Sequence, residues 1–401
     1  MSLNETPLAN RLHVGLFGRR NSGKSSLLNA LTGQQAALVS DTPGTTTDPV
    51  YKAMELHGVG PVVFIDTAGF DDTGELGGKR VGKTRLAAEK TDVALLLFTD
   101  GDDMTEELRW MKWFQARKTP LAAIVSRVDE RADRGASLAK AVEEAAGLSP
   151  LRVSVRDAAS VEAVRQTILR LVPEEYDDVS VTGGLAKPGD TVLLVMPQDI
   201  QAPKGRLILP QVQTIRDLLE KSCVVVAATT ATLSEALARL REPPSLIITD
   251  SQAFAGVYAQ KPRESRLTSF SVLFAAYKGD IEYYAASAEK LDELPPTARV
   301  LIAEACTHNA LDADIGRIKI PAALKKRLGP EITIDVRSGN DFPRDLTPYD
   351  LVIHCGGCMF NRRYVLSRVA DAKSQGVPMT NYGILLAKLA GILDKIELPA
   401  G

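Results

Sequence analysis

The sequence predicts an α/β protein built on parallel sheets, and three observations support this fold class. Short apolar runs of strand length alternate with amphipathic stretches of helical period along most of the 401 residues. A glycine-rich loop over 18–25 joins the first apolar run to a helical pattern. An acidic and then glycine-rich stretch over 174–190 interrupts the alternation, so we expect a linker there.

Composition limits the size, the partners and the compartment. A chain this long normally forms two or three domains, and we predict three, over 1–173, 191–262 and 263–401. The formal net charge of −2 provides no general basic field, which disfavours a nucleic-acid partner. Four cysteines, with no charged-then-apolar leader before Leu12, indicate a reducing cytoplasm. The apolar runs are far shorter than the roughly 20 residues of a membrane span, so no membrane association is expected.

In the first domain, buried strands are expected where apolar runs are continuous, with helices between them. These runs are Leu12–Phe17, Pro61–Ile65, Val93–Phe98, Leu121–Val125 and the shorter Leu151–Val153. Their regular alternation with helical stretches favours an α/β domain.

The middle region is predicted to contain three strands, each followed by a helix. The strands are Thr191–Met196, Cys223–Ala228 and Ser245–Thr249, and the helices are Gln211–Lys221, Leu233–Leu240 and Ser251–Gln260. A layer this small buries little surface alone and leaves its sheet edges open. We therefore expect it to pair with a copy of itself in a homodimer.

The last region is also expected to alternate strands and helices. No internal sequence repeat is evident along the chain. Strands are expected at Val300–Ala303, Ile332–Val336 and Leu351–Ile353, and helices at Tyr283–Leu291, Asn361–Lys373 and Ile384–Leu393. Two groups of cysteine and histidine begin at strand ends, which is where ligands gather in open α/β sheets.

The loop after the first strand has the pattern of a phosphate-binding loop. It consists of Gly18-Arg19-Arg20-Asn21-Ser22-Gly23-Lys24-Ser25, followed by Ser26 in the helical pattern. Its backbone N–H groups are expected to surround phosphate oxygens, while Lys24 reaches the outer phosphates and Ser25 ligates magnesium.

A second phosphate-sensing element follows the strand Pro61–Ile65. Asp66 of the sequence Asp66-Thr67-Ala68-Gly69 is expected to hold the magnesium shell, and the Gly69 N–H to meet the terminal phosphate. Between the two elements, the stretch 43–48 offers threonine hydroxyls that could become ordered around metal and phosphate.

The scarce cysteines and histidines gather in two short groups, which predicts a metal site. Cys306 and His308 form one group, and His354, Cys355 and Cys358 form the other. Such a set suits either zinc or an iron–sulfur cluster, and the spacing alone does not choose between them.

We favour a cluster held by the three cysteines, because 45 residues separate His308 from His354 within a domain that has strands of its own. Gly356 and Gly357 support this choice, since backbone without Cβ can approach sulfides and donate N–H bonds to them. His354 or His308 is a candidate for the fourth iron position; each could instead donate a hydrogen bond to a ligand.

The nucleotide motifs resemble those of the translation-factor-related GTPases, in the branch with the tRNA-modification GTPase and Era. In that branch the second threonine of Gly-Thr-Thr ligates magnesium, and Thr46 holds that place. Asn21 matches an asparagine that ligates an activating potassium ion in several members. Phe70 stands where Ras-like proteins have glutamine, so slow intrinsic hydrolysis is expected. The resemblance thus implies catalytic roles for Lys24, Thr46, Asp66 and Gly69.

The base-reading element departs from that family. Where Asn-Lys-x-Asp is usual, this chain has Ser126-Arg127-Val128-Asp129. Asp129 can still accept from the guanine N1 and N2 donors, and Arg127 can lie over the base, so we expect preference for guanine over adenine. Ser154 is expected in the last base-contacting loop.

The whole chain resembles the FeFe-hydrogenase maturation GTPases of the HydF type. The resemblance rests on Cys306-Thr307-His308, on His354-Cys355-Gly356-Gly357-Cys358, and on the motifs Asn21–Ser25 and Gly44–Asp48. It implies a 4Fe-4S cluster on the three cysteines and a middle domain that forms the dimer, in addition to the GTP, magnesium and potassium implied by the resemblance to the translation-factor-related GTPases. It also implies a scaffold that receives a diiron precursor, made with two radical-SAM maturases, and delivers it to the hydrogenase apoprotein.

Two other functions remain open on the sequence. One is an RNA- or ribosome-associated GTPase with a structural zinc domain. The other is a binding module in which the nucleotide is structural and is not hydrolysed.

Overall fold

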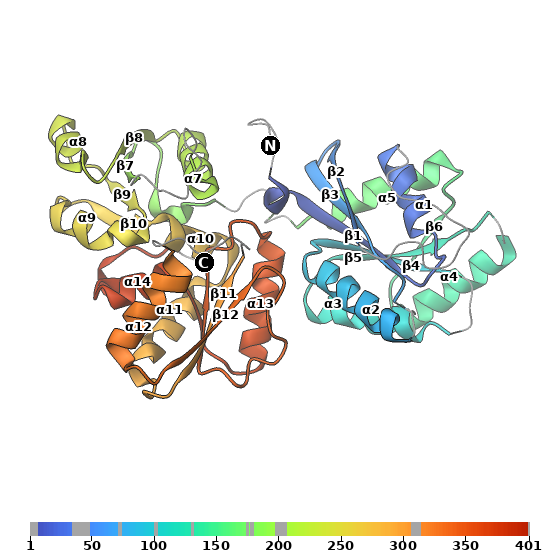
Figure 1. The fold of residues 1–401 in the computed structure, drawn as a ribbon. Coiled ribbons are helices and arrows are strands. Elements are labelled where there is room, and N and C mark those ends of the chain that lie inside the picture. The colour runs from blue at the N-terminus through green and yellow to red at the C-terminus, as the bar shows by residue number, and fades with distance from the viewer. Residues whose placement is uncertain are drawn as a thin grey trace. The chain divides into compact units, whose positions relative to one another are not determined.

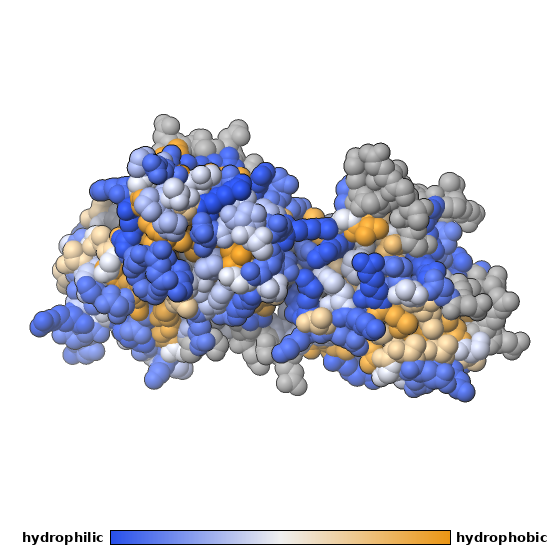
Figure 2. Space-filling model, turned by 90° about the horizontal axis from the view of Figure 1, so that it is seen from below, coloured by the Kyte–Doolittle hydropathy of each residue, from blue (hydrophilic) through white to orange (hydrophobic). Residues whose placement is uncertain are grey.

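The computed structural model describes residues 7–33, 49–70, 74–99, 103–129, 132–173, 176, 180–196, 207–305 and 314–399. The chain divides into two compact units between Asp177 and Asp178. Hydrophilic residues cover most of the face shown in Figure 2, with hydrophobic residues in patches between them. None of the helices in the described ranges is long and apolar enough to cross a membrane.

The first unit is built on a six-stranded sheet with the order β2-β3-β1-β4-β5-β6. Its strands are β1 (Leu12–Gly18), β2 (Val50–Leu56), β3 (Gly60–Asp66), β4 (Val93–Phe98), β5 (Leu121–Ser126) and β6 (Leu151–Val153). The five predicted strands are confirmed, and β2 is an unpredicted edge strand that runs antiparallel to β3. It was missed because its side chains alternate in burial, whereas the strands β3, β4 and β5 are mostly apolar and buried.

Helices cover both faces of this sheet (Figure 1). They are α1 (Lys24–Thr32), α2 (Gly74–Glu89), α3 (Thr105–Ala116), α4 (Ala132–Ala146) and α5 (Ala158–Leu171), with a short turn η1 (Leu8–Asn10) before β1. Apolar residues of α1 and α5 share one core with the strands, and those of α2, α3 and α4 share another. This arrangement leaves the carboxyl ends of the parallel strands free to carry the nucleotide loops.

The second unit contains two four-stranded parallel sheets, ordered β10-β9-β7-β8 and β12-β11-β13-β14. The first has β7 (Thr191–Val195), β8 (Val224–Ala228), β9 (Leu246–Thr249) and β10 (Arg266–Ser269). The second has β11 (Arg299–Glu304), β12 (Thr333–Ser338), β13 (Leu351–His354) and β14 (Met379–Asn381).

Helices and short turns of the unit are η2 (Gly183–Leu185), α7 (Leu209–Glu220), α8 (Leu233–Arg239), η3 (Ser251–Ala253), α9 (Phe254–Gln260), α10 (Phe270–Lys278), α11 (Ile281–Glu289), η4 (Lys290–Glu293), η5 (Ile315–Lys319), α12 (Ile320–Leu328), α13 (Arg362–Ser374), α14 (Tyr382–Leu389) and η6 (Leu393–Lys395).

Two predicted boundaries need correction. The middle layer has four strands instead of three, because β10 pairs in parallel with β9, so a domain end at 262 would cut the sheet. The end of the predicted linker 174–190 is packed structure: Val181 and Leu185 are buried, and Asp217 of α7 accepts the N–H groups of Val181 and Thr182 at 3.0 and 3.1 Å. Both segments are short and partly polar, so their apolar signal in the sequence is weak.

The two layers of the second unit form a repeat, contrary to the sequence expectation. In the first layer, β7 is an inner strand with β8 on one side and β9 and β10 on the other. In the second layer, β11 is likewise an inner strand with β12 on one side and β13 and β14 on the other. In each, the last strand leads directly into a helix capped by the final strand residue, Ser269 or Asn381. Residues 268–279 and 380–391 align without a gap, and each segment starts with threonine and ends with glycine.

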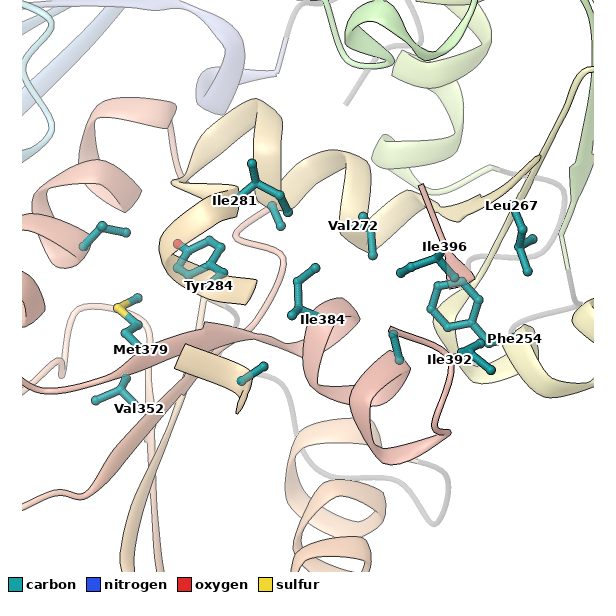
Figure 3. Packing of buried hydrophobic residues seen from close by; sticks show 14 of the residues in the cluster. Phe254, Leu267, Val272, Ile281, Tyr284, Val352, Met379, Ile384, Ile392 and Ile396 are labelled. Atoms are coloured by element: carbon teal, nitrogen blue, oxygen red, sulfur yellow. The ribbon is translucent and has the colours of Figure 1, made fainter. Parts of the chain in front are cut away.

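The two layers share one hydrophobic core, part of which Figure 3 shows. Phe254 and Leu267 come from the first layer, and Val352, Met379 and Ile384 from the second. A hydrogen bond between the layers accompanies this packing, because Thr268 Oγ1 donates to the Glu397 carbonyl at 2.8 Å. Its counterpart Thr380 Oγ1 donates to the Tyr284 carbonyl of α11 at 2.9 Å. The second unit is therefore a single packed body whose two layers hold each other in place.

Candidate functional site

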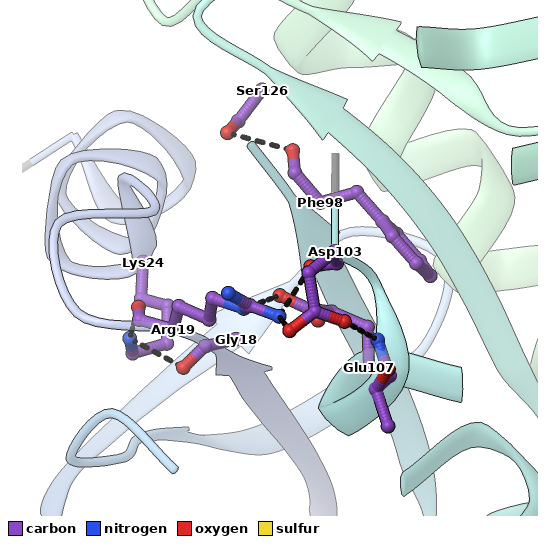
Figure 4. Close-up of polar contacts among 8 residues, drawn as sticks. Gly18, Arg19, Lys24, Phe98, Asp103, Glu107 and Ser126 are labelled. Carbon is purple, nitrogen blue, oxygen red and sulfur yellow. Dashed lines mark hydrogen bonds and ion pairs between the residues drawn. The ribbon is translucent and has the colours of Figure 1, made fainter. Parts of the chain in front are cut away.

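The phosphate-binding loop is closed around the ammonium of Lys24. Lys24 Nζ donates to the carbonyls of Gly18 at 3.0 Å and Arg19 at 2.7 Å (Figure 4). Gly23 has φ +87°, a left-handed conformation that favours glycine. A Cβ on Gly18 would lie 2.8 Å from the Leu97 carbonyl oxygen, so that position also has no room for a side chain. The loop thus has the backbone shape that cradles phosphate.

Two oxygen groups suited to magnesium lie side by side below this loop. Ser25 Oγ donates to Asp66 Oδ2 at 2.5 Å, and the Asp66 side chain is buried. Burial raises the pKa of Asp66, an effect partly opposed by the Ser25 hydrogen bond and the Lys24 charge. Asp66 Oδ1 has no hydrogen-bond partner among the described residues. A hard cation would satisfy this oxygen, so the donor set fits Mg²⁺.

The structure describes the residues directly after Asp66 up to Phe70. Gly69 is buried at the end of this segment, and Phe70 packs against Trp110 of α3 with ring centroids 6.0 Å apart. Ser22 and Ser26 lie in and just after the phosphate loop, while Asn21 is exposed with φ +58°. Thr46 lies outside the described residues.

The segments expected to contact the base meet at the carboxyl ends of β5 and β6. Ser126 Oγ donates to the Ser22 carbonyl at 2.7 Å, so it fastens the phosphate loop to β5. Asp129 forms an ion pair with Arg156 at 3.5 Å, and the Arg156 N–H donates to Ser154 Oγ at 3.2 Å. Arg127 has φ +59°. Arg156, which sequence reasoning missed, therefore connects the two loops that are expected to hold the base.

A second missed residue, Arg19, ties the phosphate loop to α3. Arg19 Nε donates to Glu107 Oε1 at 2.8 Å, and the guanidinium also contacts Asp103 (Figure 4). Glu107 is only 3% exposed. The sequence did contain a signal for this contact. Glu107 is an acidic residue on a helix face that is otherwise mostly aromatic and buried.

The cysteine site lies where β11 and β13 end next to each other. The Cys355 N–H donates to the Ala303 carbonyl at 2.9 Å, which continues the pairing of the two strands. The Ala305 N–H points at Cys355 Sγ from 3.0 Å, and the Gly357 N–H from 3.4 Å. Burial raises the pKa of Cys355 to about 11, although these two N–H groups act in the opposite direction. Cys306 and His308 lie outside the described residues, but Ala305 is the residue directly before Cys306.

Gly357 adopts a left-handed backbone conformation that favours glycine. Its φ is +61°, and a Cβ there would lie 3.0 Å from a methyl group of Val365. The turn after Cys355 therefore favours glycine, and it turns an N–H toward the sulfur.

His354 does not fit the predicted role of fourth iron ligand. It is fully buried, and its Nδ1 lies 2.6 Å from the Cys355 carbonyl while its Nε2 lies 3.0 Å from Arg368 Nη1. A carbonyl only accepts and a guanidinium only donates, so Nδ1 carries the proton and the Nε2 lone pair is already used. Burial, together with the Arg368 charge, lowers the pKa of His354 to about 3, which keeps the ring neutral.

Two buried cations flank this site, and sequence reasoning missed both. Lys278, at the end of α10, is 1% exposed, and Arg368, on α13, is 2% exposed. The Arg368 guanidinium lies over the rings of Phe342, Phe360 and Tyr364 at 4.5–4.6 Å. Burial lowers the pKa of Lys278 to about 8, against the opposing influence of Cys358 and Cys355.

Within the described ranges, no three or more histidine, cysteine or acidic side chains gather as a metal site. Neither Cys355 nor Cys358 forms a disulfide bond with another described residue. The site described here supplies two of the three predicted sulfurs, and the third belongs to the segment that follows Ala305.

Comparisons with known proteins match the two compact units separately. Residues 13–127 match the model of the 50S ribosome-binding GTPase family. The tRNA modification GTPase MnmE of Laribacter hongkongensis is 38% identical over 163 residues, covering 40% of this chain and 35% of that protein. GTPase Der of Wolinella succinogenes is 47% identical over 89 residues, covering 21% and 19%. The chain thus spans about a third of the length of the MnmE relatives it matches.

Solved structures give a weaker similarity. The crystal structure of a point variant of Aquifex aeolicus Era bound to GDP.AlF4− matches with 18% identity and a TM-score of 0.36, covering 54% of this chain and 92% of that one. An Era complex with MgGDPNP and a segment of 16S ribosomal RNA matches with a TM-score of 0.37 and 18% identity, covering 54% and 91%.

The fold and the phosphate loop define the first unit as a P-loop GTPase domain. The second unit matches two further models: residues 181–279 match the hydrogen maturase F dimerization domain, and residues 282–398 match its tetramerization domain. The chain therefore belongs to the HydF-type hydrogenase maturation GTPases.

Proposed function

We propose that this protein is a GTP-hydrolysing scaffold that holds a 4Fe-4S cluster on Cys306, Cys355 and Cys358. It carries a diiron precursor on that cluster and delivers it to the FeFe-hydrogenase apoprotein. The observation that supports this most is the 3.0 Å contact of the Ala305 N–H with Cys355 Sγ. It brings the chain just before Cys306 next to the second cysteine group.

The chemistry of the described residues fits an iron–sulfur cluster. Two N–H groups point at Cys355 Sγ, as they do at cluster sulfurs, and two buried cations offset negative charge. Because His354 has no free lone pair, the fourth iron position is left to an exchangeable ligand or to His308. An exchangeable position is what a carrier needs, since cargo must bind there and leave without breaking a structural bond.

In the first unit, the proposed nucleotide is GTP with Mg²⁺. Lys24 contacts the outer phosphates, Ser25, Thr46 and Asp66 surround the magnesium, and the Gly69 N–H meets the terminal phosphate. Asn21 is assigned to an activating potassium ion, and Arg127, Asp129 and Ser154 to guanine. Ordering of the threonine loop by GTP would change the contacts available to partners, which are the hydrogenase apoprotein and two radical-SAM maturases.

Self-association is assigned to the middle layer. Strand β8 lies at the edge of its sheet, and Val224, at its start, is 56% exposed. Leu219 and Val212 of the neighbouring α7 are 55% and 47% exposed. An exposed apolar edge is a favourable place for a homodimer to form. We assign the protein to the reducing cytoplasm, where its thiols remain available.

The test is activation of apo-hydrogenase by purified protein loaded with cluster and precursor. Lys24→Ala should abolish GTP turnover and leave bound iron unchanged, whereas Cys355→Ala should lose the iron and keep GTP turnover. Full activation by Cys355→Ala would contradict the carrier role. Equal affinity of the GTP and GDP forms for every partner would contradict the proposed gating.

A further inference from the structure

Lys278 has an environment that the fold alone does not require. It is the last residue of α10 in the first layer, yet its ammonium is directed at the cysteine loop of the second layer. Lys278 Nζ donates to the carbonyls of Phe360 at 2.6 Å, Gly357 at 3.2 Å and Cys358 at 3.3 Å. One buried ammonium thus fixes the backbone on both sides of Cys358.

No carboxylate among the described residues pairs with the buried ammonium of Lys278. Besides the three carbonyls, Lys278 Nζ lies 5.8 Å from the ring centroid of Phe274. Within the described ranges, the ionisable groups that act on it are the thiols of Cys358 and Cys355. Burying an ammonium without a paired anion is costly, so an anion at the two cysteines would compensate the buried charge of Lys278.

The repeat provides an internal comparison. In the aligned segments, Lys278 corresponds to Ala390, which follows α14. The same helix end is therefore built without a lysine in the second layer. The lysine occurs in the copy whose helix end meets the cysteine loop.

We propose that Lys278 is a positioning residue of the cluster site, which holds the loop 355–360 in shape and offsets the negative charge of the iron-bound thiolates. This inference rests on the proposed function. A nearby positive charge favours the reduced, more negative cluster, so Lys278 raises its reduction potential.

The test compares Lys278→Gln, Lys278→Met and Lys278→Arg in the full chain, purified without oxygen. Glutamine keeps a donor for the carbonyls but removes the charge, methionine removes both, and arginine keeps the charge. Iron and sulfide content measures loop positioning, and a redox titration followed by EPR measures the potential. Lys373→Met is the control, because Lys373 is half-exposed and pairs with Asp280.

The expected result for Lys278→Gln is a bound cluster whose one-electron reduction is about tenfold less favourable, equivalent to about 59 mV. Lys278→Met should in addition bind less iron, and Lys278→Arg should restore the potential, while Lys373→Met should not change it. A wild-type potential in both Lys278→Gln and Lys278→Met would overturn the inference. Wild-type protein that binds zinc and no sulfide would instead overturn the proposed function, and this inference with it.

Discussion

In the layer β7–β10, strand β9 ends at Thr249 and is followed by Asp250, whereas in the layer β11–β14, strand β13 ends at His354 and is followed by Cys355. The two layers have the same strand order, so these residues occupy equivalent places at the carboxyl edge of each sheet. Thr249 Oγ1 bonds the neighbouring β7 at the Val195 carbonyl, while the N–H groups around Cys355 converge on its sulfur. One architecture thus provides two similar edges, and the proposed cluster lies at the edge where a cysteine follows the strand.

The largest expected difference between the layers is in bound iron. Cys355→Ala should lose nearly all iron and sulfide, because a cluster on three thiolates cannot spare one. Asp250→Ala, at the equivalent place, should retain the wild-type content. Iron loss in Asp250→Ala with a normal unfolding transition would break the distinction between the layers.

The next effect is on cysteine reactivity in the metal-free protein. Burial raises the pKa of Cys355 to about 11, so at pH 8 its thiolate fraction is far below that of an ordinary cysteine. Alkylation of Cys355 should therefore be about a hundredfold slower than that of a free cysteine. Because deprotonation is the limiting factor, the rate should rise about tenfold per pH unit until the pH approaches 11. Mass spectrometry of the Cys355 peptide follows this rate, and a rate equal to that of the free amino acid would contradict the raised pKa.

A smaller effect tests the contact between the two layers. A Cβ on Gly383 would lie 2.6 Å from Ser271 Oγ and 2.9 Å from the Ser271 carbonyl carbon. Gly383→Ala should lower the free energy of unfolding by about 1–3 kcal/mol, because the backbone must shift. Gly256→Ala is the matched control, since a Cβ there meets nothing within 4 Å and alanine favours the helix. Urea unfolding measures both, and equal stability of the two variants would argue against close packing of the layers.

The last effect, of similar size, tests whether His354 is a metal ligand. His354→Ala removes the acceptor for the buried Arg368 guanidinium, so the metal-free protein should lose about 1–3 kcal/mol of stability. Thr249→Val, at the equivalent place, should cost about 1 kcal/mol. Iron binding should survive in His354→Ala. Complete loss of iron with unchanged stability would identify His354 as a ligand after all.

Several parts of this fold could be predicted from sequence because their signal is local. Strand β4 is a continuous apolar run, and its predicted and observed bounds agree at Val93–Phe98. The phosphate loop around Lys24 follows from spacing alone, since its backbone conformation depends on its own glycines. The group that begins with His354 also lies at a strand end as expected, since His354 is the last residue of β13.

The remainder depends on tertiary contacts that no local pattern encodes. Strands β10 and β14 have only four and three residues, and the buried threonines Thr268 and Thr380 are satisfied by carbonyls far along the chain. Lys278 is an ordinary basic residue at a helix end until the fold places it at the cysteine loop. His354 looked like a ligand because the sequence could not show that Arg368 already occupies its lone pair.

The central claim is that Cys306, Cys355 and Cys358 share one iron–sulfur cluster. The most direct measurement is the iron, sulfide and zinc content of protein purified without oxygen, together with the EPR spectrum after reduction. The account predicts about four iron and four sulfide per chain, with the cluster signal lost when any one of the three cysteines is replaced by alanine. About one zinc per chain with no acid-labile sulfide, or a full cluster retained without one of these cysteines, would contradict it.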